Sequence, residues 1–222
     1  MTKSVAEHFD EWAPHYDAEI RRQVPRYDEI HDTVVSLLAV RPPRRVLELG
    51  TGTGTTALRV LDAFPEAEVV AVDVSEQMLE QATQRLAAYG IRFQPHRSDI
   101  VDPELDGQYD AIVSVLAVHH LWADEKRHLF AHLWEHTAPG GIVILADAFR
   151  HASDLLRQLY DYPRPQDPHE AEHDHPDTTA EHLQWLSAAG FASVDVVWKY
   201  EDVGVLVAWK ADRKQLRRRS TD

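Results

Sequence analysis

A glycine-rich loop is the segment of this sequence whose residue types first suggest a ligand site. Residues 46–54 read Val-Leu-Glu-Leu-Gly-Thr-Gly-Thr-Gly, an apolar run that enters three glycines at alternate positions. Glycine tolerates positive φ angles and lets a ligand approach the backbone closely. A helix is expected directly after the loop, and its N–H groups favour an anionic or polar ligand group. Because several nucleotide folds use such a loop, it predicts only the general kind of ligand.

Two ligands compete for this loop. Gly52, Gly54 and Ala57 fit the dinucleotide pattern G-x-G-x-x-A, and Asp73 follows at about the distance expected for a ribose-binding acid. Glu48 favours S-adenosylmethionine instead, because an acid at the end of the first strand suits a ligand with an ammonium and a sulfonium group. The same carboxylate would repel a pyrophosphate. A tight turn that binds no ligand is the third interpretation.

Histidines are the second group of residues with functional chemistry. His119 and His120 follow an apolar run directly, where an imidazole can orient an acceptor or act as a general base. His169, His173 and His175, with acids between them, resemble a metal-binding cluster, because the first two are four residues apart. Prolines bracket that run closely, so a solvated loop or an active-site lid is favoured over a metal site.

Alternating strands and helices must position these residues. The predicted strands are 45–49, 68–72, 91–94, 109–116 and 142–146, and the predicted helices are 27–40, 55–64, 76–89, 123–137 and 178–189. This alternation favours a doubly wound parallel sheet with helices on both faces. Two further strands, 192–199 and 203–210, are joined by three residues, too few for a parallel crossover. An α/β fold is therefore predicted, with a mostly parallel sheet that ends in an antiparallel hairpin.

Composition limits the class of function. The chain has 222 residues, no cysteine and a formal net charge of −14. The lack of cysteine excludes a disulfide scaffold, a zinc ribbon and a cysteine nucleophile. The acidic balance argues against nucleic acid or an anionic membrane as partner. No signal peptide or membrane-spanning run is found, so a cytoplasmic protein is expected.

Four motifs in fixed order give the chain a family resemblance. They are Glu48 to Gly54, Val70 to Ser75 followed by Met78-Leu79, Ser98 to Ile100, and Tyr109 to Ser114 running into Val118 to Leu121. With Phe9 to Asp17 and Pro139-Gly140-Gly141, they resemble a class I S-adenosylmethionine-dependent methyltransferase. The similarity covers nearly the whole chain and is closest to the small-molecule branch that includes quinone methyltransferases. It implies a seven-stranded, Rossmann-like sheet.

The resemblance also implies which residues bind the cofactor. The set is Glu48, Gly50, Thr51, Gly52, Gly54, Asp73, Val74, Met78, Asp99, Ile100, Ser114 and Val115. Glu48 would set the loop and interact with the cofactor ammonium directly or through water. Asp73 would accept from both ribose hydroxyls, and Met78 would pack on the adenine. Asp99 would accept from the adenine amino group, beside the backbone of Ile100.

The implied reaction is in-line transfer of the methyl group of S-adenosylmethionine to a small-molecule acceptor. The candidate catalytic residues are His119, His120 and Tyr16. One alternative is an enzyme like carboxy-S-adenosylmethionine synthase, which modifies the cofactor and would hold a dicarboxylate with arginines such as Arg21, Arg22, Arg150 or Arg157. Another is a protein that binds S-adenosylmethionine without turnover. Nicotinamide binding is the least favoured.

Three regions are expected along the chain. Residues 1–26 would cover the active site, and residues 27–210 would form the methyltransferase domain with a lid-like insertion at 149–177. Residues 211–222 form a basic segment, expected to be a disordered tail. A monomer or a homodimer is expected. The acceptor itself has no signature in the sequence.

Overall fold

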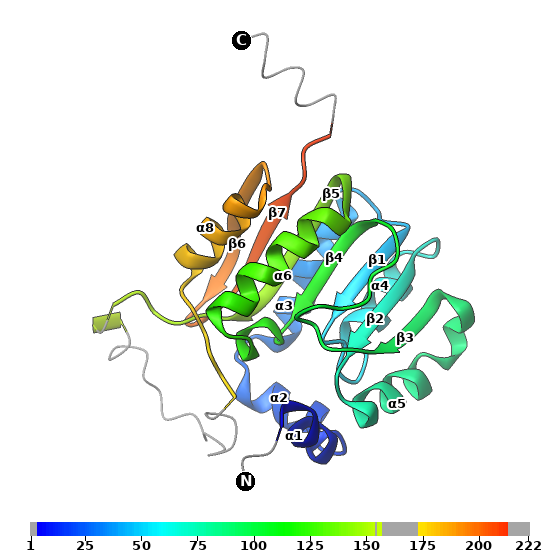
Figure 1. Ribbon diagram of the computed structural model, residues 1–222. Coiled ribbons are helices and arrows are strands. Elements are labelled where there is room, and N and C mark those ends of the chain that lie inside the picture. Colours follow the sequence, from blue (N-terminus) through cyan, green and yellow to red (C-terminus); the bar gives the residue numbers. More distant parts are fainter. Residues whose placement is uncertain (1–3, 154, 157–172, 213–222) are drawn as a thin grey trace.

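A sheet of seven strands forms the centre of the molecule. The computed structural model describes residues 4–153, 155–156 and 173–212. The strands lie in the order β3-β2-β1-β4-β5-β7-β6 (Figure 1). Their bounds are Arg45–Leu49 (β1), Glu68–Asp73 (β2), Phe93–Arg97 (β3), Tyr109–Val115 (β4), Thr137–Ala148 (β5), Ser193–Tyr200 (β6) and Val203–Trp209 (β7). Strands β1 to β5 pair in parallel, and β7 runs antiparallel between β5 and β6.

Helices cover both faces of this sheet. They are α1 (Val5–Trp12), α2 (Tyr16–Gln23), α3 (Tyr27–Ala39), α4 (Thr55–Ala63), α5 (Glu76–Arg85), α6 (Ala123–His136) and α8 (Thr179–Ala189), with 3-10 turns η1 (Ala87–Arg92) and η2 (Val118–His120). Buried residues of α3, α4 and α5 share one core with one sheet face. Buried residues of α6 and α8 share a second core with the other face. The predicted fold class is confirmed.

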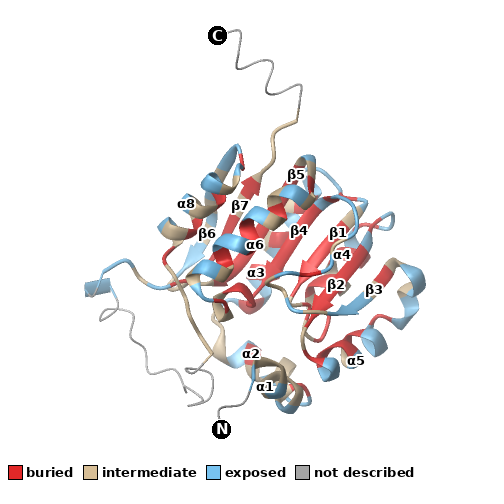
Figure 2. Ribbon diagram, in the orientation of Figure 1, coloured by how far each residue is buried: buried red, intermediate tan, exposed pale blue. Residues whose placement is uncertain are grey.

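The two cores arise because side chains alternate across a strand. In β1, Val46 belongs to the core under α3 and α4, whereas Leu47 and Leu49 belong to the core under α6 and α8. Central strands are therefore apolar on both faces, as a covered parallel sheet requires. Figure 2 shows this burial along β1, β2, β4 and β5, whereas β6 at the sheet edge is more exposed.

Three predicted elements have bounds that differ from the structure by more than one residue. The strands predicted at 91–94 and 142–146 are Phe93–Arg97 and Thr137–Ala148. The helix predicted at 76–89 ends at Arg85, because the chain tightens into 3-10 turns as it returns to β3 and Gly90 takes a φ of 55°. The motif Pro139-Gly140-Gly141 lies inside β5, which begins at Thr137. These residues form a bulge there, since the pairing with β4 shifts between Tyr109 and Ala111.

The N-terminal segment, predicted only as a cover, contains the two short helices α1 and α2. Helix α1 begins with a capping box in which Ser4 and Glu7 bond each other's backbone N–H groups. Both helices lie below the sheet in Figure 1. Among the described residues, no helix has both the length and the apolar character needed to cross a membrane.

Candidate functional site

The loop after β1 is built from backbone geometry that only glycine provides easily. Gly50 has a φ of 68°, and a Cβ there would lie 2.3 Å from the Cβ of Ala117. The N–H groups of Gly50 and Thr51 both donate to the carbonyl of Val72, at 2.8 and 3.0 Å. Gly52 has a φ of 52° and lies beside Tyr16. The loop is thereby held against the carboxyl end of β2.

Asp73 ends β2 and ties this loop to the start of α5. One carboxylate oxygen accepts from the N–H of Gly52 at 2.8 Å, and the other accepts from the N–H of Ser75 at 2.9 Å. Burial raises the pKa of Asp73, while these backbone bonds oppose the rise. The carboxylate therefore lies at the floor of the site with a fixed orientation.

Glu48 lies at the base of the glycine loop. Its side chain is buried behind the glycine loop and accepts from the hydroxyl of Thr51 at 2.8 Å. Burial raises the pKa of Glu48 to about 7. Since Glu48 does not line the cavity, its observed contacts are those of a residue that sets the loop.

A cavity of about 260 Å³ lies at the carboxyl ends of β1, β2 and β4. The predicted site residues that line it are Gly50, Gly52, Asp73, Val74, Met78, Asp99, Ile100, His120 and Tyr16. Those that do not line it are Glu48, Thr51, Gly54, Ser114, Val115 and His119. Ser114 instead donates to the carbonyl of Leu49 at 2.9 Å and joins the ends of β4 and β1.

Sequence reasoning missed several cavity residues. Leu116 follows β4 with a φ of 55°, unusual for a residue with a side chain. Phe9, Leu121 and Trp122 add an apolar and aromatic wall. Leucine carries no signal for a positive φ, so Leu116 was not recognisable. Phe9 lies in the N-terminal motif, and that motif was the signal available for it.

Helices α1 and α2 close one side of the cavity. Asp10 of α1 accepts from the hydroxyl of Ser75 at 2.6 Å and from the N–H of Gln77 at 3.2 Å. The hydroxyl of Thr53 donates to Asp17 of α2 at 2.6 Å, and Arg85 forms an ion pair with the same carboxylate. Both helices are thus attached to the elements that carry the glycine loop and Asp73.

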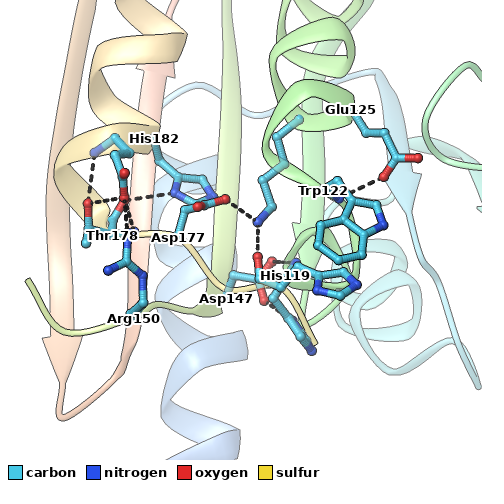
Figure 3. Close-up of polar contacts among 11 residues, drawn as sticks. His119, Trp122, Glu125, Asp147, Arg150, Asp177, Thr178 and His182 are labelled. Carbon is cyan, nitrogen blue, oxygen red and sulfur yellow. Dashed lines mark hydrogen bonds and ion pairs between the residues drawn. The ribbon is translucent and has the colours of Figure 1, made fainter. Parts of the chain in front are cut away.

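Histidines and acids form the opposite wall. His120 lines the cavity, and His119 lies behind it with its Nδ1 against Asp147 of β5 (Figure 3). Burial lowers the pKa of His119, but the charge and hydrogen bond of Asp147, together with the charge of Asp174, outweigh burial, so the pKa is raised. Burial and the neighbouring His119 lower the pKa of His120. The two adjacent imidazoles therefore differ in their readiness to bind a proton.

Residues 173–178 run along this wall. The ring of His175 stacks on Trp122 with centroids 3.4 Å apart. The fully buried ammonium of Lys126 contacts the carbonyl of His175 and, at 2.8 Å, the carboxylate of Asp177. The His119 carbonyl accepts from the His175 N–H at 2.7 Å. This segment is therefore attached to the η2 turn and to α6.

The predicted histidine cluster reaches the site only in part. His173 and His175 line the cavity, whereas His169 lies outside the described residues. Within the described part of the chain, two other groups bring metal-ligating atoms together: His119, His120 and Asp174, and Asp102, His128 and His132. The first group lies at the cavity wall, and the second contains exposed side chains.

Comparison with known proteins identifies a methyltransferase domain in this chain. Residues 46–141 match the family described as a methyltransferase domain. An uncharacterized methyltransferase of Oceanobacillus iheyensis is 28% identical over 170 residues, covering 75% of this chain and 77% of its own. Residues 46–141 are thus a methyltransferase domain, and the match and the relatives support an S-adenosylmethionine-dependent methyltransferase.

Other relatives of this methyltransferase have different names. The carboxy-S-adenosyl-L-methionine synthase of Nautilia profundicola is 23% identical over 218 residues, 90% of this chain and 93% of the relative. The demethylmenaquinone methyltransferase of Deinococcus radiodurans is 29% identical over 160 residues, 71% of this chain and 66% of the relative. At these identities the acceptor does not follow from similarity.

Solved structures share the fold of the methyltransferase. Magnesium protoporphyrin IX methyltransferase of Synechocystis PCC 6803, with bound S-adenosylmethionine, has a TM-score of 0.67 at 20% identity and matches 93% of this chain and 95% of its own. The methyltransferase SibL has a TM-score of 0.65 at 21% identity, and this chain spans just over half of it, 54%. Substrates and partners are therefore proposals.

The cavity suits the cofactor of this methyltransferase class, S-adenosylmethionine. The positive-φ glycines leave its floor free of side chains, and Asp73 places a carboxylate there. Met78 and Ile100 add apolar surface, and Asp99 adds a second carboxylate. Acidic and apolar groups in one cavity fit a cationic nucleoside and disfavour a pyrophosphate.

Proposed function

We propose that this cavity holds the cofactor over the glycine loop and a small-molecule acceptor against the wall formed by Phe9, His120 and Trp122. The observation that carries the proposal is that both sets of residues line the same cavity. A ligand bound at Asp73 and one bound at His120 would therefore share one cavity. The acceptor class is supported by the apolar and aromatic character of the wall.

The proposed cofactor contacts follow the residues at the cavity floor. Asp73 would accept from ribose hydroxyls with a carboxylate already oriented by Gly52 and Ser75. Met78 would pack against the adenine. Asp99, whose carboxylate accepts from the N–H of Val101 at 2.9 Å, would accept from the adenine amino group. When bound, S-adenosylmethionine supplies a methyl group on a sulfonium leaving group.

The chain's own contribution is position and exclusion of water. Helices α1 and α2 cover the cavity, and residues 173–178 border its opposite side. Holding two reactants in line contributes up to roughly 7–11 kcal/mol to the lowering of a barrier. Residues 1–26 are accordingly proposed as the cover of the active site. Within 149–177, the lid is proposed only for the described residues 149–153, 155–156 and 173–177. A cytoplasmic location stays a prediction.

The acceptor branch is proposed with less detail. The aromatic and aliphatic wall of Phe9, Leu116, Leu121 and Trp122 would suit a flat, apolar acceptor such as a quinone precursor. The similarity to a demethylmenaquinone methyltransferase supports the same branch. His120 and Tyr16 border this space, whereas His119 lies behind His120, so His120 is better placed to contact an acceptor. A general base at His119 or His120 stays a prediction.

Calorimetry with S-adenosylmethionine, S-adenosylhomocysteine and NAD tests the proposed function. We expect both adenosyl ligands to bind and Asp73→Asn to weaken them about 10- to 100-fold, the effect of losing hydrogen bonds to a charged group. Asp195→Asn, a change of an exposed acid on β6, is the matched control and should leave binding unaltered. Binding of NAD alone, or equal affinities for wild type and Asp73→Asn, would contradict the proposal.

The carboxy-S-adenosylmethionine synthase alternative is supported by the length of its match, 93% of the relative. Its dicarboxylate would need a cationic partner, and the described cavity lining contains neither arginine nor lysine. Arg21 instead bonds Asp28 at 2.6 Å, Arg22 donates to the carbonyl of Ala18, and Arg150 bonds Glu181. Arg157 lies outside the described residues. Mass spectrometry of the co-purified ligand distinguishes the methyltransferase from the synthase, since a carboxylated cofactor would support the synthase.

A further inference from the structure

Three side chains from two separate parts of the chain bring their ligand atoms together at one spot on the cavity wall. His119 and His120 come from the η2 turn, and Asp174 comes from the segment before α8. Their ligand atoms all lie within 4.8 Å of one another. Asp174 Oδ1 is 3.1 Å from His120 Nδ1 and 3.6 Å from His119 Nε2.

These separations match the edges of a metal coordination shell. Nitrogen and oxygen ligands at about 2.0–2.1 Å from a tetrahedral Zn²⁺ are about 3.4 Å from each other. The two measured distances, 3.1 and 3.6 Å, lie on either side of that value. The carbonyl oxygen of His173, 3.3 Å from His120 Nδ1, borders the same spot.

Asp147 prepares His119 for such a role. Its carboxylate contacts His119 Nδ1 and also accepts from the backbone N–H of His119 at 3.0 Å. The Nδ1 proton is thereby held by Asp147, and Nε2 is the ring nitrogen that faces Asp174. A carboxylate behind a ligating imidazole is the usual support of a histidine that binds metal.

The acids of the cluster favour a cation. Asp174 Oδ1 is buried, yet despite its two close neighbours it has no hydrogen bond of regular geometry within the described residues. Lys126, the nearby cation, is engaged by Asp177. Asp147 and Asp174 thus bring two carboxylates to the imidazoles of this spot, and a buried oxygen without a donor is costly.

We propose that His119, His120 and Asp174 form a three-ligand site for a divalent transition-metal ion such as Zn²⁺. Two imidazoles and one carboxylate suit the borderline metals, and three protein ligands leave a position for another oxygen. His120 lines the cavity, and we infer that this open position faces the acceptor there. Metal binding itself is independent of the proposed function.

The role of the ion in catalysis rests on the proposed function. An acceptor hydroxyl bound to the metal has a lowered pKa and loses its proton to solvent water. The oxygen then forms a bond to the methyl carbon as the carbon–sulfur bond breaks, and the sulfonium leaves as a neutral thioether. The same imidazoles would thus serve as ligands in place of a general base, and the acceptor class would be a hydroxylated small molecule.

Titration of the chelator-treated full chain with Co²⁺, followed by visible absorption, tests the site. The background variant His128→Gln/His132→Gln removes the exposed group that also offers ligands. We expect one equivalent to bind with the absorption of a low-coordinate ion. Asp174→Asn and the supporting change Asp147→Asn should each weaken binding about 10- to 100-fold. Asp124→Asn, an exposed acid on α6, should leave it unchanged.

Each outcome separates this proposal from the preceding one. Thermal melting and calorimetry with S-adenosylmethionine establish that each variant is folded. No saturable Co²⁺ binding, or equal affinity in the background protein, Asp174→Asn and His120→Gln, would overturn the metal site and leave cofactor binding untouched. Co²⁺ binding that depends on Asp174, in a chain that binds neither adenosyl ligand, would support the metal site and overturn the proposed function.

Discussion

His31 is a buried histidine on α3, away from the cavity. Its Nδ1 lies 3.1 Å from the hydroxyl of Thr56, and its Nε2 is buried without a hydrogen-bond partner among the described residues. Burial is the main cause that lowers the pKa of His31 to about 3, from an ordinary value of 6.5. The folded protein therefore holds this imidazole neutral in conditions where the unfolded chain protonates it.

This depressed pKa predicts a loss of stability in acid. The unfolded chain binds a proton first, so the free energy of unfolding falls as the pH drops from about 6.5 toward about 3. At about pH 5 the loss from His31 alone is about 2 kcal/mol. Between about pH 7.5 and about pH 5, the free energy of unfolding in urea should fall by about 2 kcal/mol less in His31→Leu than in wild type. The exposed control His15→Leu should keep the wild-type loss.

Glu48 gives stability a pH dependence of the opposite sign to that of His31. Burial raises the pKa of Glu48 to about 7, whereas its ordinary value is 4.5. The folded state then binds the proton more tightly, so stability is present below about pH 4.5 and falls as the pH rises to about 7. The loss is of the order of 3 kcal/mol. Glu48→Gln, which resembles the protonated acid, should gain about that much relative to wild type between about pH 4.5 and about pH 8 in urea unfolding.

A pH-independent difference between Glu48→Gln and wild type would contradict this prediction. Glu68→Gln, at the exposed start of β2, is the matched control and should show no such trend. The measurement uses protein without added cofactor, so that ligand binding does not contribute.

The attachment of α1 to α5 is the feature to test at the scale of elements. Asp10 of α1 accepts from Ser75 and Gln77 at the first turn of α5, and the bond from Ser75 is the main cause that lowers the pKa of Asp10. The carboxylate also suits the positive end of the helix dipole. A helix of eight residues has little stability alone, so α1 depends on such contacts.

Asp10→Ala should therefore release α1 from the cavity. We expect faster limited proteolysis within residues 1–26 and a roughly 10-fold weaker affinity for S-adenosylmethionine, equivalent to about 1.4 kcal/mol. Glu80→Ala, an exposed change on the same α5, should leave both readouts at the wild-type level. Unchanged proteolysis in Asp10→Ala would mean that α1 is held by its apolar contacts instead.

Local patterns account for the elements that sequence analysis located. β1 is an apolar run between Pro42-Pro43 and glycines, and its bounds agree with the prediction at 45–49. The hairpin of β6 and β7 followed from a connection too short for a crossover. Helices α1 and α2 were not located, because short helices owe their stability to tertiary contacts rather than to periodicity.

At the scale of the whole molecule, the site residues that local sequence patterns predict differ from those that only the fold brings together. Gly50, Gly52 and Asp73 were recognisable because a strand, a turn and a helix place them within one continuous segment and its neighbour. The grouping of His119 with Asp174 was not, since the two residues come from distant parts of the chain. No spacing in the sequence encodes that contact; the sheet order and the path of 173–178 bring it about.

The position of β7 has a consequence for how the chain acquires its structure. Of the strands in the described residues, β7 is the last in chain order, yet it lies inside the sheet between β5 and β6 and contributes to both cores. Until residues 203–209 leave the ribosome, the long apolar edge of β5 has no partner. Such an edge is a template for wrong pairing with another chain. During synthesis, this edge of β5 is therefore protected only once β7 has been made and has paired with it.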